Sequence, residues 1–264
     1  MSILLRSVSA LVAALTVLAL ASVAKADGLD SIMAAKVIKV AVPQDFAPFG
    51  FVGKDLKPQG YDIDMANLIA KELGVKAELV PVTSANRIAY LQTKKVDLVI
   101  SSLGKNAERE KAIDFSAPYA PFYSAVYSPK GKYPDVKVLA DLAGKTVGAA
   151  RGTIEEQELT STVPKDTTIK RFEDNNATIA AYMSGQIDLV ATGNTIAAVI
   201  AERNPAQAPE MKFMVKNSPC YVGLNKDEPK LLAKVNEIIG KAKASGELAK
   251  LSEKWLKAPL PAGF

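Results

Sequence analysis

Apolar and polar positions along the chain alternate between the short period of strands and the longer period of helices. In the first half, apolar runs rich in Val, Ile and Leu predict strands, and they are separated by segments with helical spacing. One of these helical segments carries Met65, Leu68, Ile69 and Leu73 on one face and stops at Gly74. The expected strands are 37–42, 79–82 and 96–101, and the expected helices are 62–73 and one through 88–91.

A second run of the same kind begins near Lys145. Thr153 and Glu156 fit a T-x-x-E capping box that opens a helix, and Asn194 is expected to cap another helix ending near residue 202. The other elements expected here are strands 146–150, 168–172 and 187–192 and a helix at 176–184. The C-terminal part returns to helices at 230–242 and 248–256, in which Trp255 is expected to pack in the core, with ligand stacking as the alternative.

The two runs resemble each other. The segment IAYLQTKKVDLVISS, residues 88–102, aligns without gaps on IAAYMSGQIDLVATG, residues 179–193, with five identical positions. Alternation of strands and helices is typical of a mainly parallel sheet covered by helices. The sequence therefore predicts two α/β lobes of similar design rather than one continuous sheet.

The first 26 residues have the pattern of a cleavable signal peptide. Arg6 precedes an apolar run, and Ala24-Lys25-Ala26 forms an A-x-A cleavage site. A membrane anchor is the alternative, although the apolar run is only about long enough to span a bilayer. We expect a mature protein that begins at Asp27 and is soluble and exported to the periplasm.

Composition and charge exclude several classes of function. Without residues 1–26 the chain has 31 basic and 28 acidic residues, a mild net charge of +3 that does not predict nucleic-acid binding. The chain has no His, which removes His-based catalysis and most transition-metal sites, although Ser-Lys or carboxylate mechanisms stay open. The single Cys220 cannot form an internal disulfide and is expected to be a buried thiol. No cofactor and no metal site is predicted.

Candidate binding residues follow the strands, because ligands of open α/β sheets bind at the carboxyl ends of strands and at helix N-termini. Arg109 lies in the first turn of a helix expected after Asn106, where the helix dipole disfavours a cation. A guanidinium there can bind a carboxylate through two hydrogen bonds, or it can be a surface residue paired with an acid. The candidates at the strand ends are Ser101, Ser102 and Gly104 in the first lobe, and Thr153, Gly193 and Asn194 in the second.

Several segments also resemble a known family. GYDIDMANLIAKEL, residues 60–73, is similar to the signature of periplasmic solute-binding proteins for polar amino acids, which serve ABC importers. DFAPFGF (45–51), KVDLVISSL (95–103), AIDFSAPY (112–119) and KWL (254–256) look like further segments of the same family, in the same order. The likeness covers residues 36–256 and implies two lobes that close on the ligand about a hinge of two strands.

The resemblance implies a role for each candidate residue. Phe46 would pack on the ligand, Ser102 and Gly104 would donate or accept hydrogen bonds, and Arg109 would grip the α-carboxylate with help from Thr153. It also implies lobe 1 at residues 27–121 and 220–264 and lobe 2 at 122–219. A monomer that delivers its ligand to an ABC permease of the inner membrane is expected.

One position departs from the family pattern. Amino-acid receptors of this family usually have an Asp at the end of a lobe 2 strand, where it binds the ammonium group of the ligand, and this chain has Gly193 there. Asn194, Thr192 or Glu155 could replace the acceptor, but only Glu155 would replace the charge.

The leading hypothesis is therefore a periplasmic receptor for a small carboxylate-bearing solute, a polar amino acid or a derivative. An enzyme on the same scaffold, similar to a dehydratase with Glu155 as its acid, and a sensory module that presents its ligand to a membrane receptor are the alternatives.

Overall fold

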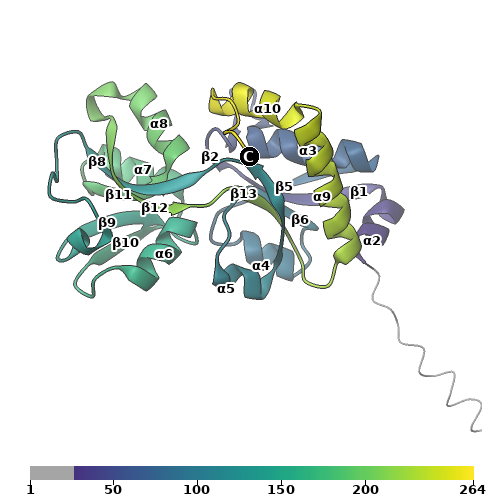
Figure 1. Cartoon of the computed structure of the whole chain (residues 1–264), viewed down its shortest axis with the longest axis horizontal. Coiled ribbons are helices and arrows are strands. Elements are labelled where there is room, and N and C mark those ends of the chain that lie inside the picture. Colours follow the sequence, from purple (N-terminus) through teal and green to yellow (C-terminus); the bar gives the residue numbers. More distant parts are fainter. Residues whose placement is uncertain (1–26) are drawn as a thin grey trace, which may run out of the picture.

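The computed structural model describes residues 27–264, so the predicted signal peptide lies outside the described residues. Two five-stranded sheets, each flanked by helices, form two lobes that lie side by side (Figure 1). The strand orders are β5-β1-β6-β13-β7 in lobe 1 and β10-β9-β11-β8-β12 in lobe 2. In each sheet one strand, β13 or β8, is antiparallel to its neighbours on both sides. This arrangement confirms the predicted two-lobed, mainly parallel α/β fold.

Lobe 1 contains most of the N-terminal half and the C-terminal helices. Its strands are β1 (Val37–Pro43), β5 (Lys76–Val82), β6 (Leu98–Leu103), β7 (Asp114–Ala120) and β13 (Cys220–Leu224). Its helices are α2 (Gly28–Ala35), α3 (Tyr61–Leu73), α4 (Arg87–Gln92), α5 (Ala107–Ala112), α9 (Pro229–Ala244) and α10 (Glu247–Leu251), followed by a π-helical turn, η4 (Ser252–Leu256). A small sheet of β2 (Asp45–Phe46), β3 (Gly50–Val52) and β4 (Pro58–Gln59), which the sequence pattern did not predict, leads into α3.

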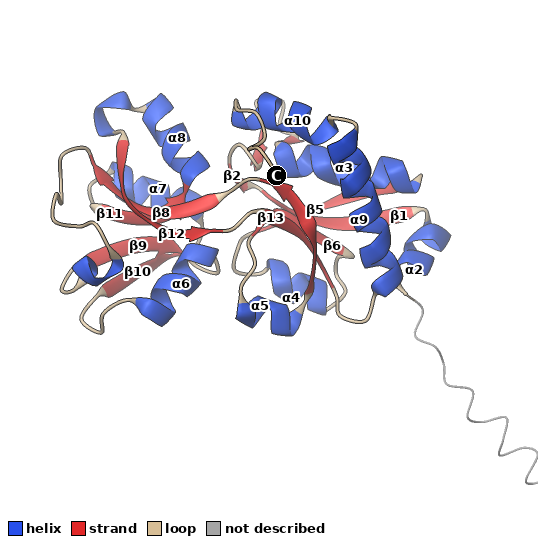
Figure 2. Ribbon diagram, viewed as in Figure 1, coloured by secondary structure: helices blue, strands red, loops and turns tan. Residues whose placement is uncertain are grey.

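Lobe 2 is one uninterrupted stretch of chain. Its strands are β8 (Tyr123–Pro129), β9 (Thr146–Ala150), β10 (Thr168–Phe172), β11 (Leu189–Gly193) and β12 (Pro209–Asn217). Its helices are α6 (Ile154–Thr162), α7 (Asn175–Met183) and α8 (Asn194–Arg203), with short 3₁₀ turns η2 (Leu139–Leu142) and η3 (Pro205–Gln207). Figure 2 shows helices on both faces of this sheet and of the lobe 1 sheet.

The chain passes between the lobes twice. Residues 121–122 join β7 to β8, and residues 218–219 join β12 to β13. In Figure 1 these two connections run close to each other between the sheets. We propose to divide the chain into lobes at these crossings.

The start of α8 differs from prediction. Gly193, not Asn194, is the N-cap of α8, and no side chain caps this helix. The prediction for Asn194 was wrong because its Oδ1 accepts a hydrogen bond from the Tyr123 N–H at 3.3 Å instead. Asn194 therefore ties the start of α8 to the strand that leaves the crossing.

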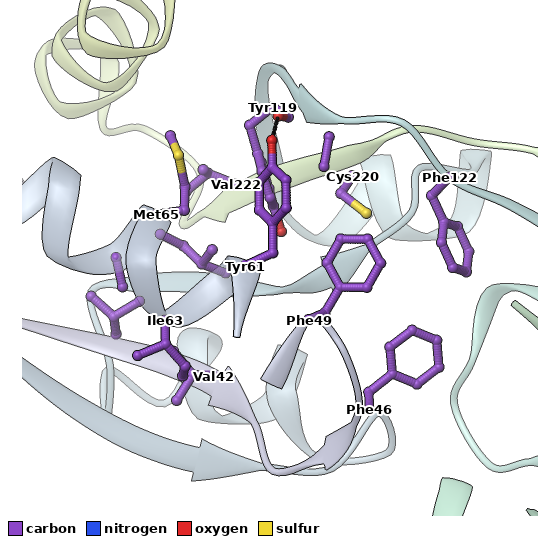
Figure 3. Packing of buried hydrophobic residues seen from close by; sticks show 14 of the residues in the cluster. Val42, Phe46, Phe49, Tyr61, Ile63, Met65, Tyr119, Phe122, Cys220 and Val222 are labelled. Carbon is purple, nitrogen blue, oxygen red and sulfur yellow. Dashed lines mark hydrogen bonds between the residues drawn. The ribbon is translucent and has the colours of Figure 1, made fainter. Parts of the chain in front are cut away.

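The largest apolar cluster extends over both lobes. Figure 3 shows the rings of Phe46, Phe49 and Phe122 close together, and their centroids lie about 6 Å apart. Tyr61, at the start of α3, donates a hydrogen bond to the Tyr119 carbonyl at 2.9 Å. Trp255 packs against the cluster and its indole N–H donates to Asp64 Oδ2 at 2.7 Å, in line with the predicted packing role. Aromatic packing thus holds the entry to α3 against the segment that leads to the crossing.

Candidate functional site

A cavity lies between the two lobes and is lined by residues from both. The space there that protein atoms leave unfilled is about 320 Å³ when open solvent is included. Of the predicted site residues, Phe46, Ser101, Ser102, Thr153 and Glu155 line it, and Gly104, Arg109, Gly193 and Asn194 do not. The other lining residues are Pro43, Asp45, Ser84, Arg87, Phe122 and Ile154.

Two chain segments bring the predicted polar groups to the cavity. Ser101 and Ser102 lie near the carboxyl end of β6, and Thr153 is the N-cap of α6, where its hydroxyl accepts from the Glu156 N–H. The predicted capping box is only half formed, because Glu156 reaches the Gly152 N–H and pairs with Arg171. The start of α6 therefore faces the end of β6 across the gap between the lobes, and the positive end of a helix dipole favours an anion there.

Ser102 is held in place by a buried carboxylate. Its N–H and hydroxyl both donate to Asp62 Oδ2, at 2.7 and 3.2 Å, and Ser102 has a positive φ of 44°. The Tyr119 hydroxyl donates to the other oxygen of Asp62 at 2.6 Å. Burial raises the pKa of Asp62 to about 7, although these hydrogen bonds act to lower it. Asp62, the third residue of the GYDID segment, therefore acts on the site through Ser102.

Arg109 lies next to the cavity and bridges the lobes. The predicted cap is present, since Asn106 Oδ1 accepts from the Arg109 N–H at 2.9 Å. The guanidinium donates to the Gly104 carbonyl in lobe 1 at 2.7 Å and to the Gly152 carbonyl in lobe 2 at 2.9 Å. Burial, reinforced by Arg87, lowers the pKa of Arg109 to about 9. That Arg109 grips a carboxylate stays a prediction.

Arg87 is a cavity residue that the sequence analysis missed. It is only 3% exposed, and it donates to the carbonyl oxygens of Ser101 and, at 3.3 Å, of Gly152. Its Nε–H and that of Arg109 are buried without a hydrogen-bond partner within residues 27–264. Burial also lowers the pKa of Arg87. Two guanidinium groups therefore meet at one carbonyl, that of Gly152, and both retain an unused donor.

Glu155 is the acidic residue with the strongest electrostatic effect on these two arginines. It is 2% exposed, and burial raises its pKa against the opposing effects of its own N–H, the Thr153 hydroxyl, Arg109 and Arg87. Among nearby charges, Glu155 has the largest influence in raising the pKa of Arg87. Glu155 is thus a charge partner of both arginines, and its predicted contact with a ligand ammonium is untested.

Gly193 is covered by aromatic rings. A Cβ atom at this position would lie 2.5 Å from Cε2 and Cζ of Phe122 and 3.1 Å from Cζ of Phe46. Its φ of −71° is available to any residue, so space and not backbone conformation requires glycine here. The structure gives a physical reason for the missing Asp, because the Phe122 ring fills the place of its side chain.

A second carboxylate, Asp45, also lines the cavity and contacts lobe 2. Its Oδ2 accepts from the backbone N–H and the side-chain Nδ2–H of Asn175, both at 2.9 Å. Asn175 is the first residue of α7 in lobe 2, whereas Asp45 belongs to β2 beside lobe 1. No local sequence signal predicts this contact, because the two residues are 130 positions apart.

The described residues contain no group of three or more His, Cys, Asp or Glu side chains that could hold a metal ion. No helix in residues 27–264 is both long and apolar enough to span a membrane.

Comparison with known proteins agrees with this architecture. Residues 38–258 match the family of bacterial extracellular solute-binding proteins, family 3. The L-cystine-binding protein TcyJ of Escherichia coli (strain K12) is 30% identical over 219 residues, which cover 83% of this chain and 82% of that protein. The cysteine-binding protein of Campylobacter jejuni has a TM-score of 0.81 at 27% identity, covering 90% of this chain and 96% of that one.

The amino-acid ABC transporter substrate-binding protein AbpA of Streptococcus pneumoniae, bound to L-arginine, has a TM-score of 0.79 at 34% identity, over 86% of this chain and 98% of that one. The match of the family over most of the chain, together with two lobes around a polar cavity, confirms the resemblance noted in the sequence. The chain belongs to the bacterial extracellular solute-binding proteins, family 3.

Proposed function

We propose that the protein is a periplasmic receptor that binds an amino acid or a close derivative between its lobes and delivers it to an ABC permease of the inner membrane. The family and its relatives support this role, since by their names the relatives bind L-cystine, arginine, glutamine, or glutamate and aspartate. Each of these ligands has an α-carboxylate and an α-ammonium group. In this proposal the receptor acts as a monomer.

The observation that carries the proposal is the buried guanidinium group of Arg87 in the cavity wall. Glu155 and Asp45 act on Arg87 as nearby charges, but within residues 27–264 no carboxylate forms an ion pair with it. A buried guanidinium without an ion pair is costly, and it pairs best with a planar anion such as a carboxylate. The unpartnered Nε–H of Arg87 and the start of α6, which both belong to the cavity wall, favour an anion at the same place. A ligand carboxylate bound here would contact groups from both lobes.

Calorimetric titration tests this assignment. Mass spectrometry of small molecules released from the purified protein on denaturation gives the first candidates. We then expect amino acids to bind and the matching amino alcohols, which lack the carboxylate, to bind at least thirtyfold more weakly, since breaking a buried charge pair costs about 2–5 kcal/mol.

Substitutions of Arg87 test whether this residue binds the carboxylate of the ligand. Arg87→Ala should lose most of the preference for amino acids over amino alcohols, and Arg87→Lys should restore it only in part, because an ammonium group lacks the planar fork. Arg203→Ala, at an exposed arginine of α8, is the matched control and should bind like the parent. Equal binding of amino acids and amino alcohols by the parent protein would refute a carboxylate site.

We propose that the protein binds its ligand without converting it. The dehydratase-like alternative has one observation in its favour, the raised pKa of the buried Glu155 in the cavity wall. Mass spectrometry of the ligand after prolonged incubation with the protein distinguishes the two. The sensory alternative has no separate support in the structure, and a pull-down against permease and receptor domains tests it.

A further inference from the structure

We propose that Asp45, and not residue 193 or Glu155, binds the ammonium group of the ligand, and that it does so with the oxygen not used in its contact with lobe 2. This inference rests on the proposed function, because it assumes a ligand that carries both a carboxylate and an ammonium group. The proposal gives β2 a role in ligand binding that the sequence of this segment does not predict.

At position 193, where the family resemblance predicts an aspartate that binds the ligand ammonium, the structure has no room for a side chain. The rings of Phe122 and Phe46 cover Gly193 so closely that even a methyl group there would require a ring to move. Both rings line the cavity, so a ligand meets aromatic surface at this point. An ammonium group therefore needs a carboxylate elsewhere in the wall, and the wall offers two, Asp45 and Glu155.

Glu155 is already engaged. It lies at the start of α6. Burial raises its pKa, and its own N–H, the Thr153 hydroxyl, Arg109 and Arg87 lower it. Removing it from these groups to meet an ammonium would leave two buried guanidinium groups with less compensation. Asp45 also raises the pKa of Arg87, but less than Glu155 does, so we assign Glu155 as the main charge partner of the arginines.

Asp45 has the free acceptor. The residue is only 7% exposed, and both hydrogen bonds from Asn175 go to the same oxygen, Oδ2. Within residues 27–264 no hydrogen bond reaches Oδ1, and Oδ1 is not among the fully buried atoms that lack a partner. Asp45 lines the cavity, so we assign the surface that Oδ1 retains to the cavity side.

An ammonium bound by Oδ1 would also affect closure of the lobes. The same carboxylate would then join the ligand through Oδ1 and the start of α7 through Oδ2. Charge-assisted hydrogen bonds of this kind are roughly twice as strong as neutral ones. Ligand binding and the contact between β2 and α7 would therefore reinforce each other.

Matched pairs of ligands test the assignment directly. The probes are L-arginine with 5-guanidinopentanoic acid, L-glutamine with 4-carbamoylbutanoic acid, and L-cysteine with 3-mercaptopropanoic acid, which differ by the α-amino group. We expect the parent to prefer the amino member of its best pair by at least thirtyfold. Asp45→Asn should abolish most of this preference, because its amide oxygen can still accept from Asn175 while the charge facing the cavity is lost.

Two further variants separate the possible causes. Glu155→Gln should keep the preference for the amino ligand. Asn175→Ala removes one hydrogen bond to Oδ2 and leaves the Asp45 charge, so it should weaken both members of a pair by similar factors. Circular dichroism confirms that each variant is folded.

The assignment is overturned if Asp45→Asn keeps the preference, if Glu155→Gln is the variant that loses it, or if the parent shows no preference between the members of any pair. A parent protein that binds neither series would overturn the proposed function, and this assignment with it. Loss of binding to both series in Asp45→Asn would show that Asp45 acts only in closure and would also overturn the assignment.

Discussion

Replacement of Gly193 by alanine tests whether the aromatic rings set the shape of the cavity. The added Cβ would lie 2.5 Å from two atoms of the Phe122 ring and 3.1 Å from the Phe46 ring. Carbon atoms in contact prefer a separation of about 3.5–4.0 Å, so the Phe122 ring must move by about 1 Å. Phe122 is only 5% exposed and packs against Phe46 and Phe49, which leaves it little room.

Overpacking of this kind costs about 1–3 kcal/mol. In a chain of this size each kcal/mol corresponds to about 2–4 °C in melting temperature. We therefore expect Gly193→Ala to melt several degrees below the parent by calorimetry, with a similar loss of free energy of unfolding in urea. Backbone conformation adds no penalty, since the φ of −71° suits alanine.

A matched control and a double-mutant cycle make the test specific. Gly240 lies in α9 with no atom within 4 Å of an added Cβ, so Gly240→Ala should be neutral or stabilising by up to about 1 kcal/mol. Combining Gly193→Ala with Phe122→Leu should cost less than the sum of the two single changes by about 1 kcal/mol or more. Additive effects, or a Gly193→Ala variant as stable as the parent, would show that the ring does not occupy this space.

Two further predictions concern buried aspartates outside the cavity wall. Asp27 accepts from the Leu29 N–H and from the N–H groups of Lys230 and Leu231, so it caps both α2 and α9, and Asp27→Ala should lower the free energy of unfolding in urea by about 1–2 kcal/mol. Burial raises the pKa of Asp62 to about 7 from an unfolded value near 3.8, so the native state keeps a proton that the unfolded chain releases. The free energy of unfolding should therefore fall as pH rises from about 4 to about 7, and above pH 7 this contribution should level off. The Asp62→Asn variant should lack that slope. An identical dependence of stability on pH in both proteins would contradict the raised pKa of Asp62.

Local patterns in the sequence predicted the fold and part of the site. Periodicity located β1, β5, β6, β9, β10 and β11 and most of the helices, but it did not locate β7, β8, β12 or β13. Short-range capping placed Asn106 before Arg109 and Thr153 before α6. Ser101 and Ser102 followed from the rule that ligands meet the carboxyl ends of strands. These features depend on neighbours a few residues away, so the sequence alone contains the information.

The features that were missed depend on contacts between the lobes. Arg87 has the pattern of an ordinary first helical residue, and only the approach of Gly152 from lobe 2 shows that it is buried in the cavity wall. That approach itself requires glycine, because Gly152 has a φ of 72° and a Cβ would lie 2.7 Å from the backbone of Ser84 and Ala85. The contact of Asp45 with Asn175 is likewise invisible until the two lobes are placed together.

If the residues act as we propose, the charges around the cavity restrict the net charge of the ligand. Arg87 and Arg109 contribute two positive charges, and Asp45 and Glu155 contribute two negative ones when ionised. Burying a net charge is costly, so a ligand with one carboxylate and one ammonium group preserves the balance, whereas an additional ligand charge disturbs it. Glu155 is the group best able to compensate for an extra negative charge, because burial already raises its pKa and so favours its protonated form. Ligand charge and the protonation of Glu155 are therefore linked, and the four side chains act as one unit in recognition.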